Sequence, residues 1–377
     1  MAEASPAAGV HAGRRHVVLA HPQPEALRAV GAALAQEFTV DVIEDGGAAL
    51  EALAFGRCCL AVVAMPLPVL SGLEALRRLS AMHLRHRPLL LAVGAGDDVR
   101  LKVVVTHGLA DAVQAVPCPD GVLLRRIWQL VDRELEQRWA RLPPLPRTVV
   151  SSTRSLLSTA GDVVRDGGEL GSEAARVAGR QVVETLAARL MGNVLTSLQA
   201  HHDYTFAHSF RVATHLATFA LATGMRRTDA ELLAQAGLLH DIGKTAIPVR
   251  ILDKPGPLDS SEWPVVQRHP VVAAEVLRRT PTLASHLIRI AERHHERLDG
   301  TGYPHGLKGA AIDEPSLLCA IADVHTALTD RRAYRSPLDD HVALDRMRPL
   351  AGHHFEPGMF RRYEQVMRDG GDGVSRA

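Results

Sequence analysis

The chain has 377 residues, of which 46% are hydrophobic and 23% charged, and its formal net charge is +1. This length predicts two or three domains with an ample core. The near-zero charge excludes a global field that would attract DNA or a membrane surface. The sequence has no apolar run of the ~18 residues that a membrane span needs, and residues 1–15 lack a signal-peptide core. We therefore expect a cytoplasmic protein with no DNA binding and no membrane insertion.

Cysteine and histidine are distributed differently along the chain. The four cysteines, Cys58, Cys59, Cys118 and Cys319, show no spacing typical of a disulfide framework, which suits a reducing compartment. Fourteen of the twenty histidines follow residue 195, a bias that requires an explanation in the second half of the chain.

Short apolar runs alternate with helical patterns over residues 15–135. Five runs predict buried strands at 17–20, 40–43, 60–63, 89–93 and 112–116, and five segments predict helices at 24–36, 47–54, 73–81, 97–107 and 120–135. A succession of strand–helix units of this kind predicts an α/β domain with a doubly wound, flavodoxin-like parallel sheet.

The order and spacing of these units resemble a response-regulator receiver domain. The segment from Met65 to Gly72 is similar to the one that follows the phosphorylated aspartate in that family. The positions that carry the family's chemistry differ here and fall on His21, Pro22, Ala64, Val93 and Val116. Without carboxylates there is no Mg²⁺ site and no phospho-acceptor. We therefore predict a degenerate receiver-like domain that is structural, dimerising or ligand-sensing, with His21 as an alternative functional residue.

Residues 136–195 are predicted to connect two domains. The prolines around Pro143 end the preceding helix, and the segment 151–171 is rich in Ser and Gly, which predicts a loose or partly helical linker. From Ser172 a helical pattern resumes, with apolar residues such as Val182 and Leu186 at mostly four-residue steps. This helix would either pair with its copy in a homodimer or pack on the following domain.

The pattern over residues 196–370 is helical, and potential metal ligands lie on its apolar stripes or at the ends of its helices. Imidazole and carboxylate groups bind divalent transition metals, and one aspartate can bridge two ions. Lys244 follows His240 by four residues and would share its face if the helix continued. The seven potential ligands are His208, His240, Asp241, His269, His294, His295 and Asp323. They predict a two-metal hydrolase, with structural histidines or a storage-type metal site as the alternative.

Residues 203–363 also resemble the HD-GYP family of the HD phosphohydrolases. The matching segments include Leu239-His-Asp-Ile-Gly-Lys244 and the run from His294-His295 to Tyr303-Pro304. The resemblance implies an all-helical fold, two divalent metal ions, iron or manganese, and hydrolysis of cyclic di-GMP to pGpG or GMP.

The resemblance also implies individual roles. His208, His240 and Asp323 would hold one ion, His269, His294 and His295 the other, and Asp241 would bridge both. Asp241 and Lys244 would be the catalytic residues. Tyr303 would offer a stacking face to guanine. The substrate-binding set would comprise Lys244, Arg211, Asp299, Gly302, Tyr303, Pro304, Arg332 and Arg335.

Three positions depart from the family pattern. Thr326 replaces an acidic residue, and Tyr204 stands where a third-metal glutamate would be. His325 replaces an aromatic residue and is interpreted as a packing substitute, with an extra hydrogen-bond donor as the alternative. We therefore expect two metals. The expected partners are cyclic di-GMP, a second copy of the chain and signalling proteins. The alternatives are a slow or inactive adaptor that binds cyclic dinucleotides and a hydrolase of another cyclic dinucleotide.

Overall fold

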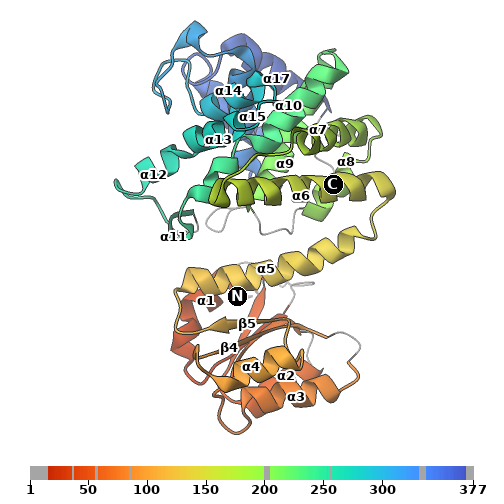
Figure 1. Cartoon of the computed structure of the whole chain (residues 1–377), viewed down its shortest axis with the longest axis vertical. Coiled ribbons are helices and arrows are strands. Elements are labelled where there is room, and N and C mark those ends of the chain that lie inside the picture. The colour runs from red at the N-terminus through yellow and green to blue at the C-terminus, as the bar shows by residue number, and fades with distance from the viewer. Residues whose placement is uncertain are drawn as a thin grey trace, which may run out of the picture. The chain divides into compact units, whose positions relative to one another are not determined.

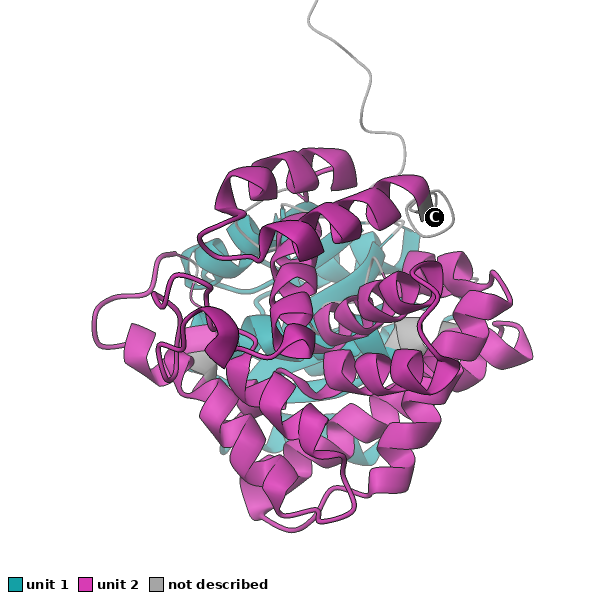
Figure 2. Ribbon diagram, turned by 90° about the horizontal axis from the view of Figure 1, so that it is seen from above, with its two compact units in different colours: residues 1–134 teal, residues 135–377 magenta. Residues whose placement is uncertain are grey.

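The protein divides into two compact units, Met1–Glu134 and Leu135–Ala377, coloured teal and magenta in Figure 2. The computed structural model describes residues 16–35, 38–55, 58–84, 87–198, 204–252, 254, 256–330 and 337–370. Within these residues no helix has both the length and the apolar character needed to cross a bilayer.

The first unit is built on a five-stranded parallel sheet with the strand order β2-β1-β3-β4-β5. Figure 1 labels β4 and β5 of this sheet. The strands are β1 (His16–Ala20), β2 (Thr39–Ile43), β3 (Cys58–Ala64), β4 (Leu89–Gly94) and β5 (Ala112–Ala115). The central strands are almost wholly buried, as expected where helices cover both faces of a sheet. This order is that of flavodoxin-like folds, so the predicted fold class is confirmed.

Helices connect the strands of this sheet. They are η1 (Pro24–Leu27), α1 (Arg28–Leu34), α2 (Gly46–Phe55), α3 (Gly72–Ala81), α4 (Val99–Thr106) and α5 (Asp120–Trp139). The Ser71 hydroxyl caps α3 by accepting the Glu74 N–H at 3.3 Å. A Cβ at Gly72 would collide with the Ala64 carbonyl oxygen, so glycine lets α3 begin directly against the end of β3.

A partly buried ion pair between Arg100 and Asp98 lies beside Met65, the residue after Ala64, which occupies the position of the missing phospho-acceptor. Ala64 is buried. The Arg100 guanidinium donates to the Met65 carbonyl at 3.2 Å and to the Asp98 carboxylate at 2.7 Å. Asp98 also caps α4. His21 accepts the Gln23 N–H at 3.1 Å, so its ring stabilises the turn after β1.

The second unit is helical throughout the part that the structure describes, where the only β-type pairing outside the first unit is an isolated bridge between Ala351 and Phe355. Its elements are α6 (Pro144–Asp166), α7 (Ser172–Ala187), α8 (Met191–Leu198), α9 (Tyr204–Ala222), α10 (Arg227–Leu239), η2 (Ile242–Ala246), α11 (Val249–Leu252), α12 (Trp263–Gln267), α13 (His269–Arg278), α14 (Ser285–Arg293), η3 (Gly309–Ala311), α15 (Glu314–Thr329), α16 (Asp340–Met347), η4 (Arg348–Leu350) and α17 (Pro357–Gly370). The predicted all-α class of this region is confirmed.

Of the two alternatives for 151–171, a loose linker and a partly helical one, the structure agrees with the second, because α6 continues to Asp166 and residues 167–171 lie outside a helix. Its serines fit a helix because their hydroxyls donate to carbonyls of the preceding turn, as Ser151 does to Thr148 at 3.1 Å. Burial of Val150 and Leu156 in the core of the second unit supplies the packing that local propensity lacks.

The apolar face of α7 is covered by the chain's own helices. Val182 is fully buried, and a Cβ at Gly179 would lie 2.7 Å from the carbonyl oxygen of Glu231 on α10. The two alternatives for this helix were pairing with its copy and packing on the following domain. The structure shows the second for the apolar face of α7. Dimerisation stays a prediction.

A buried polar layer joins α9, α15 and α17. The rings of His215 and His325 stack, with centroids 4.9 Å apart and planes at 23°. A hydrogen bond of 3.1 Å links His215 Nδ1 to the Thr326 hydroxyl, and another of 3.0 Å links His325 Nδ1 to the Tyr363 hydroxyl. The interpretation of His325 as a packing substitute was therefore incomplete, because its ring also makes a buried hydrogen bond.

This layer predicts a loss of stability in acid. Burial, and next the neighbouring His325, hold the pKa of His215 well below its usual value of 6.5. The folded state thus keeps His215 neutral, whereas the unfolded state binds a proton as the pH falls below 6.5. His215→Gln should lower the pH dependence of the unfolding free energy by up to about 1.4 kcal/mol per pH unit below that value.

The measurement is urea unfolding at several pH values, followed by the emission of the buried Trp139 in a background without Trp128 and Trp263. His286→Gln, the same change at an exposed position on α14, is the control. Equal slopes for His215→Gln and the parent chain would contradict the prediction.

Candidate metal centre

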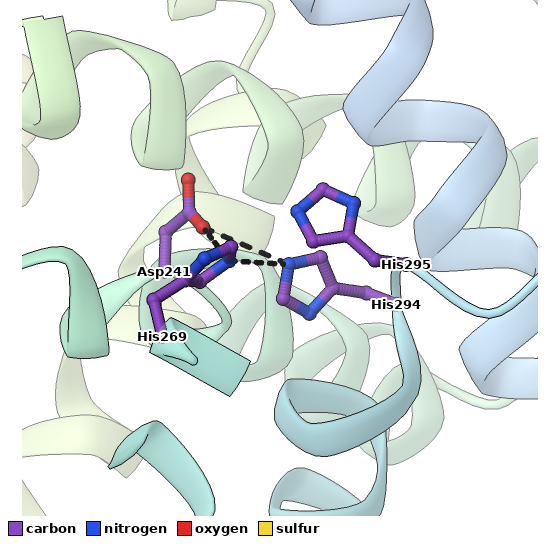
Figure 3. Close-up of side chains that lie close together, drawn as sticks. All are labelled: Asp241, His269, His294 and His295. Carbon is purple, nitrogen blue, oxygen red and sulfur yellow. Dashed lines mark hydrogen bonds and ion pairs between the residues drawn. The ribbon is translucent and has the colours of Figure 1, made fainter. Parts of the chain in front are cut away.

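Five segments of the second unit bring the seven predicted ligands together. His208 lies on α9, His240 and Asp241 follow α10, His269 begins α13, His294 and His295 follow α14, and Asp323 lies on α15. The side chains form two groups, and within each group the potential ligand atoms lie within 4.8 Å of one another. One group is His208, His240 and Asp323. The other is Asp241, His269, His294 and His295, shown in Figure 3.

The Asp241 carboxylate lies between the two groups. Its Oδ1 is 3.1 Å from His269 Nε2 and 3.6 Å from His294 Nε2. Its Oδ2 is 3.4 Å from His240 Nε2 and 3.7 Å from His208 Nε2. Each oxygen therefore faces a different set of imidazoles, which is the arrangement that a bridging carboxylate requires.

Backbone hydrogen bonds orient three of the imidazoles in the same way. The Nδ1 of His240, His269 and His294 lies 2.8, 2.7 and 2.9 Å from the carbonyl oxygen three residues earlier in each case. A carbonyl can only accept, so Nδ1 carries the proton and Nε2 presents a lone pair to the centre. This is the tautomer that metal-ligating histidines adopt.

The centre consequently places hydrogen-bond acceptor atoms close to one another. His269 Nε2 lies 3.1 Å from Asp241 Oδ1 and 3.3 Å from His294 Nε2, although none of these atoms has a proton to donate. His240 Nε2 and Asp241 Oδ1 are buried with no hydrogen-bond partner. Converging buried lone pairs cost free energy unless a cation accepts them. The residues therefore fit divalent metal ions.

His208 is oriented by a carboxylate. Its Nδ1 lies 2.8 Å from Asp330 Oδ2, and its Nε2 lies 2.9 Å from Asp323 Oδ1. Burial opposes a charge on this ring, but the hydrogen bonds to Asp323 and Asp330 outweigh burial and raise its pKa to about 9. A metal ion at Nε2 would therefore displace a proton.

Sequence reasoning missed Asp330. This buried carboxylate also accepts a 2.9 Å hydrogen bond from Arg211, which holds the guanidinium that we predicted to bind substrate. Asp330 follows Asp323 by seven residues and is the C-cap of α15, and both carboxylates lie against His208. That spacing is the signal that could have identified it. Substrate binding by Arg211 stays a prediction.

The carboxylates of the centre are ionised. Burial alone would raise the pKa of Asp241, but Lys244 and the neighbouring histidines outweigh it and hold that pKa well below the usual range. Burial would likewise raise the pKa of Asp323, but His208 and His295 outweigh burial and hold that pKa below the usual range. Burial lowers the pKa of His269, His294 and His295. Neutral imidazoles and charged carboxylates are the forms that bind metal.

The backbone conformation that brings Lys244 to the centre differs from the expected one. The α-helix ends at Leu239, and residues Ile242–Ala246 form the 3₁₀ turn η2. The Lys244 ammonium pairs with Asp241 Oδ2, three residues before it. The expectation that a continuing α-helix would place Lys244 on the face of His240 was therefore wrong, because the tighter turn aligns positions three apart.

A loop after His295 covers one side of the centre. Glu296 is buried, and its carboxylate accepts the N–H groups of His305 at 2.7 Å and Leu307 at 2.9 Å. A Cβ at Gly302 would lie 2.6 Å from the carbonyl oxygen of His295, so the loop approaches the ligand backbone where only glycine fits. The Tyr303 ring lies against His295, with centroids 4.7 Å apart.

The remaining predicted substrate residues occupy varied places. Asp299 accepts the Thr301 N–H at 2.9 Å and stabilises the loop turn. The peptide between Tyr303 and Pro304 is cis. Arg332 and Arg335 lie outside the described residues. The Thr326 hydroxyl bonds to His215 and is not among the ligand atoms, so the side chain that replaces the usual acid points away from the centre.

Removing Asp330 should weaken metal binding. Asp330→Ala leaves His208 without its orienting carboxylate, and loss of such a partner lowers metal affinity about 10- to 100-fold. Equilibrium dialysis against buffered Mn²⁺ measures the affinity. Asp313→Ala, which removes the capping carboxylate at the other end of α15, is the control. Wild-type affinity in Asp330→Ala would contradict the orienting role.

Removing Glu296 should loosen the loop without removing a ligand. Glu296→Ala leaves the amides of His305 and Leu307 without their acceptor, so their hydrogen exchange should accelerate. Glu292→Ala is the control, because that carboxylate bonds to the side chains of Arg278 and His305 and to no amide. Unchanged protection of both amides in Glu296→Ala would show that other contacts hold the loop.

Comparison with known proteins gives a consistent picture. Residues 193–359 match the family model described as HD domain. A 3'3'-cGAMP-specific phosphodiesterase 2 of Vibrio cholerae serotype O1 is 38% identical over 45% of this chain and 32% of the relative. The cyclic di-GMP phosphodiesterase PA4108 of Pseudomonas aeruginosa is 36% identical over 46% and 42%. The chain thus spans less than half the length of these relatives.

A third relative aligns over both units. The cyclic di-GMP phosphodiesterase response regulator RpfG of Xanthomonas campestris pv. campestris is 29% identical over 84% of this chain and 78% of the relative. The resemblance found in the sequence is confirmed at the level of the family. The residues that match the HD-domain family model, 193–359, include all seven candidate ligands.

Proposed function

We propose that this chain is a metal-dependent phosphodiesterase that hydrolyses cyclic di-GMP to pGpG or GMP. The observation that carries the proposal is the Asp241 carboxylate, whose two oxygens face two separate groups of imidazole lone pairs. Relatives named as phosphodiesterases of cyclic dinucleotides support the choice of substrate.

The ligand assignment follows the two groups. His208, His240 and Asp323 would hold one ion, His269, His294 and His295 the second, and Asp241 both. When bound, a pair of divalent ions, iron or manganese, supplies a nucleophilic water at neutral pH and stabilises negative charge on a phosphoryl group. The protein supplies the geometry: neutral imidazoles fixed by backbone carbonyls, and two carboxylates held ionised.

Lys244 and the loop after His295 would act on the substrate. The Lys244 side chain is 18% exposed, and an ammonium has three protons, so it can keep its pairing with Asp241 and still donate to a phosphate oxygen. Gly302 holds the loop close enough for its residues to meet a substrate whose phosphate lies at the centre. Arg332 and Arg335 are proposed to contact phosphates or guanines.

The first unit is proposed to regulate the second or to recruit signalling partners, including a second copy of the chain. Since Ala64 cannot accept a phosphoryl group, the signal would arrive by binding. The four cysteines are all free thiols, which supports the reducing cytoplasm as the proposed location.

A second candidate keeps the reaction and changes the substrate to 3'3'-cGAMP, because three relatives named as specific for it are 38%, 43% and 40% identical. Comparing the specificity constants for the two cyclic dinucleotides decides between them. The adaptor alternative predicts nucleotide binding without turnover.

The decisive experiment loads the protein anaerobically with Fe²⁺ or Mn²⁺ and follows cyclic di-GMP by chromatography. We expect pGpG or GMP to form. Asp241→Ala should lose both bound metal and product, because it removes the carboxylate whose two oxygens face the imidazoles of both groups. Asp229→Ala, which removes an exposed aspartate of α10 paired with Arg226, should keep both. No product from the metal-loaded parent chain would refute the proposal.

A further inference from the structure

A half-exposed tryptophan stands beside the metal centre. Trp263 begins α12, and 47% of its surface is accessible to solvent. The rings of Trp263 and Tyr303 form a T-shaped pair, with centroids 6.3 Å apart and planes at 75°. Tyr303 in turn lies against the candidate ligand His295. An aromatic row therefore leads from a ligand of the centre to the solvent, and Trp263 is its outer end.

The arrangement changes the expected role of Tyr303. Its ring is inclined by only 31° to the ring of His295, so that imidazole covers one of its faces. His269 contacts it at 79°, with centroids 6.4 Å apart. Tyr303 thus supports the ligand histidines and Trp263 at once. The larger aromatic surface left open in this row is the indole.

The backbone that carries Trp263 is fixed before any ligand binds. The Glu262 carboxylate accepts the Asp259 N–H at 2.9 Å and the Lys254 ammonium at 2.5 Å. Asp259 in turn accepts the N–H groups of Ser261 at 2.8 Å and Glu262 at 3.0 Å. These reciprocal bonds, which resemble a capping box, hold the turn that leads into α12. A preorganised aromatic ring loses little conformational entropy when a flat ligand stacks on it.

We propose that Trp263 binds a purine base of the nucleotide substrate by stacking, while a phosphate of the same molecule lies at the metal centre. The inference rests on the proposed function, since it assumes a nucleotide at that centre. Stacking on indole needs only a flat π system. Trp263 should therefore strengthen binding of guanine and adenine nucleotides alike and should not set the choice between them.

The first test separates binding from turnover. Trp263→Ala should raise the KM for cyclic di-GMP and for 3'3'-cGAMP by about 5- to 150-fold, as expected for loss of one stacked base, with kcat changed by less than about twofold. Trp263→Phe, which keeps a ring, should recover most of the loss. Leu252→Ala is the control, because Leu252 is another exposed apolar residue, on α11. An unchanged KM in Trp263→Ala would overturn the proposal.

The second test does not need activity. GMP should quench the emission of Trp263, whereas ribose 5-phosphate, which has the sugar and the phosphate without the base, should not. The quenching should disappear in Trp263→Phe and persist in Trp128→Phe. Quenching that is equal for both ligands, or that survives in Trp263→Phe, would overturn the proposal.

The two tests also distinguish the two proposals. If the metal-loaded chain hydrolyses no cyclic dinucleotide but GMP still quenches Trp263, the proposed reaction is wrong and the base site stands. If hydrolysis is normal and Trp263→Ala matches the parent in KM and quenching, the reaction stands and the base site is wrong.

Discussion

The burial of the Asp241 charge is the constraint on which the second unit depends. A carboxylate that is 1% exposed must be compensated by nearby donors or cations. Lys244 supplies one positive charge to Oδ2, whereas the Nε2 atoms of His240 and His269 supply only lone pairs. The helix ends that converge here therefore form a site suited to cations. The packing of α9, α10, α13, α14 and α15 holds these helix ends in place.

Helices α9 and α15 carry candidate metal ligands and also residues of the buried polar layer. On α9, His208 belongs to the centre, and His215 follows two turns later in the buried layer. On α15, Asp323 lies one turn before Thr326, whose hydroxyl bonds to His215, and Asp330 is the C-cap of the same helix. Because both sets of contacts lie on the same pair of helices, a shift of α15 against α9 would disturb the metal ligands and the buried layer together.

The sequence was sufficient for the architecture and for identifying the side chains that converge at the candidate metal centre, because apolar stripes fix the helix register and so the positions of His208, His240 and Asp323. It failed where tertiary contacts decide the outcome. Burial of Val150 and Leu156 favours the helix that runs to Asp166 through most of the segment 151–171, for which local patterns left a loose linker open. The partner of Arg211 proved to be Asp330, 119 residues away. Such a pairing depends on how α9 and α15 meet, which local patterns do not reveal.

The converging lone pairs also have a consequence for how the domain is maintained in a cell. Ions held by this set would act as cross-links between distant parts of the chain, for example between His208 and Asp323, which are 115 residues apart. A cross-link that closes so long a loop removes much of the entropy of the unfolded chain. The folded fraction of this domain would therefore depend on the free concentration of the metal. Metal scarcity would lower the amount of folded protein as well as the turnover of each molecule.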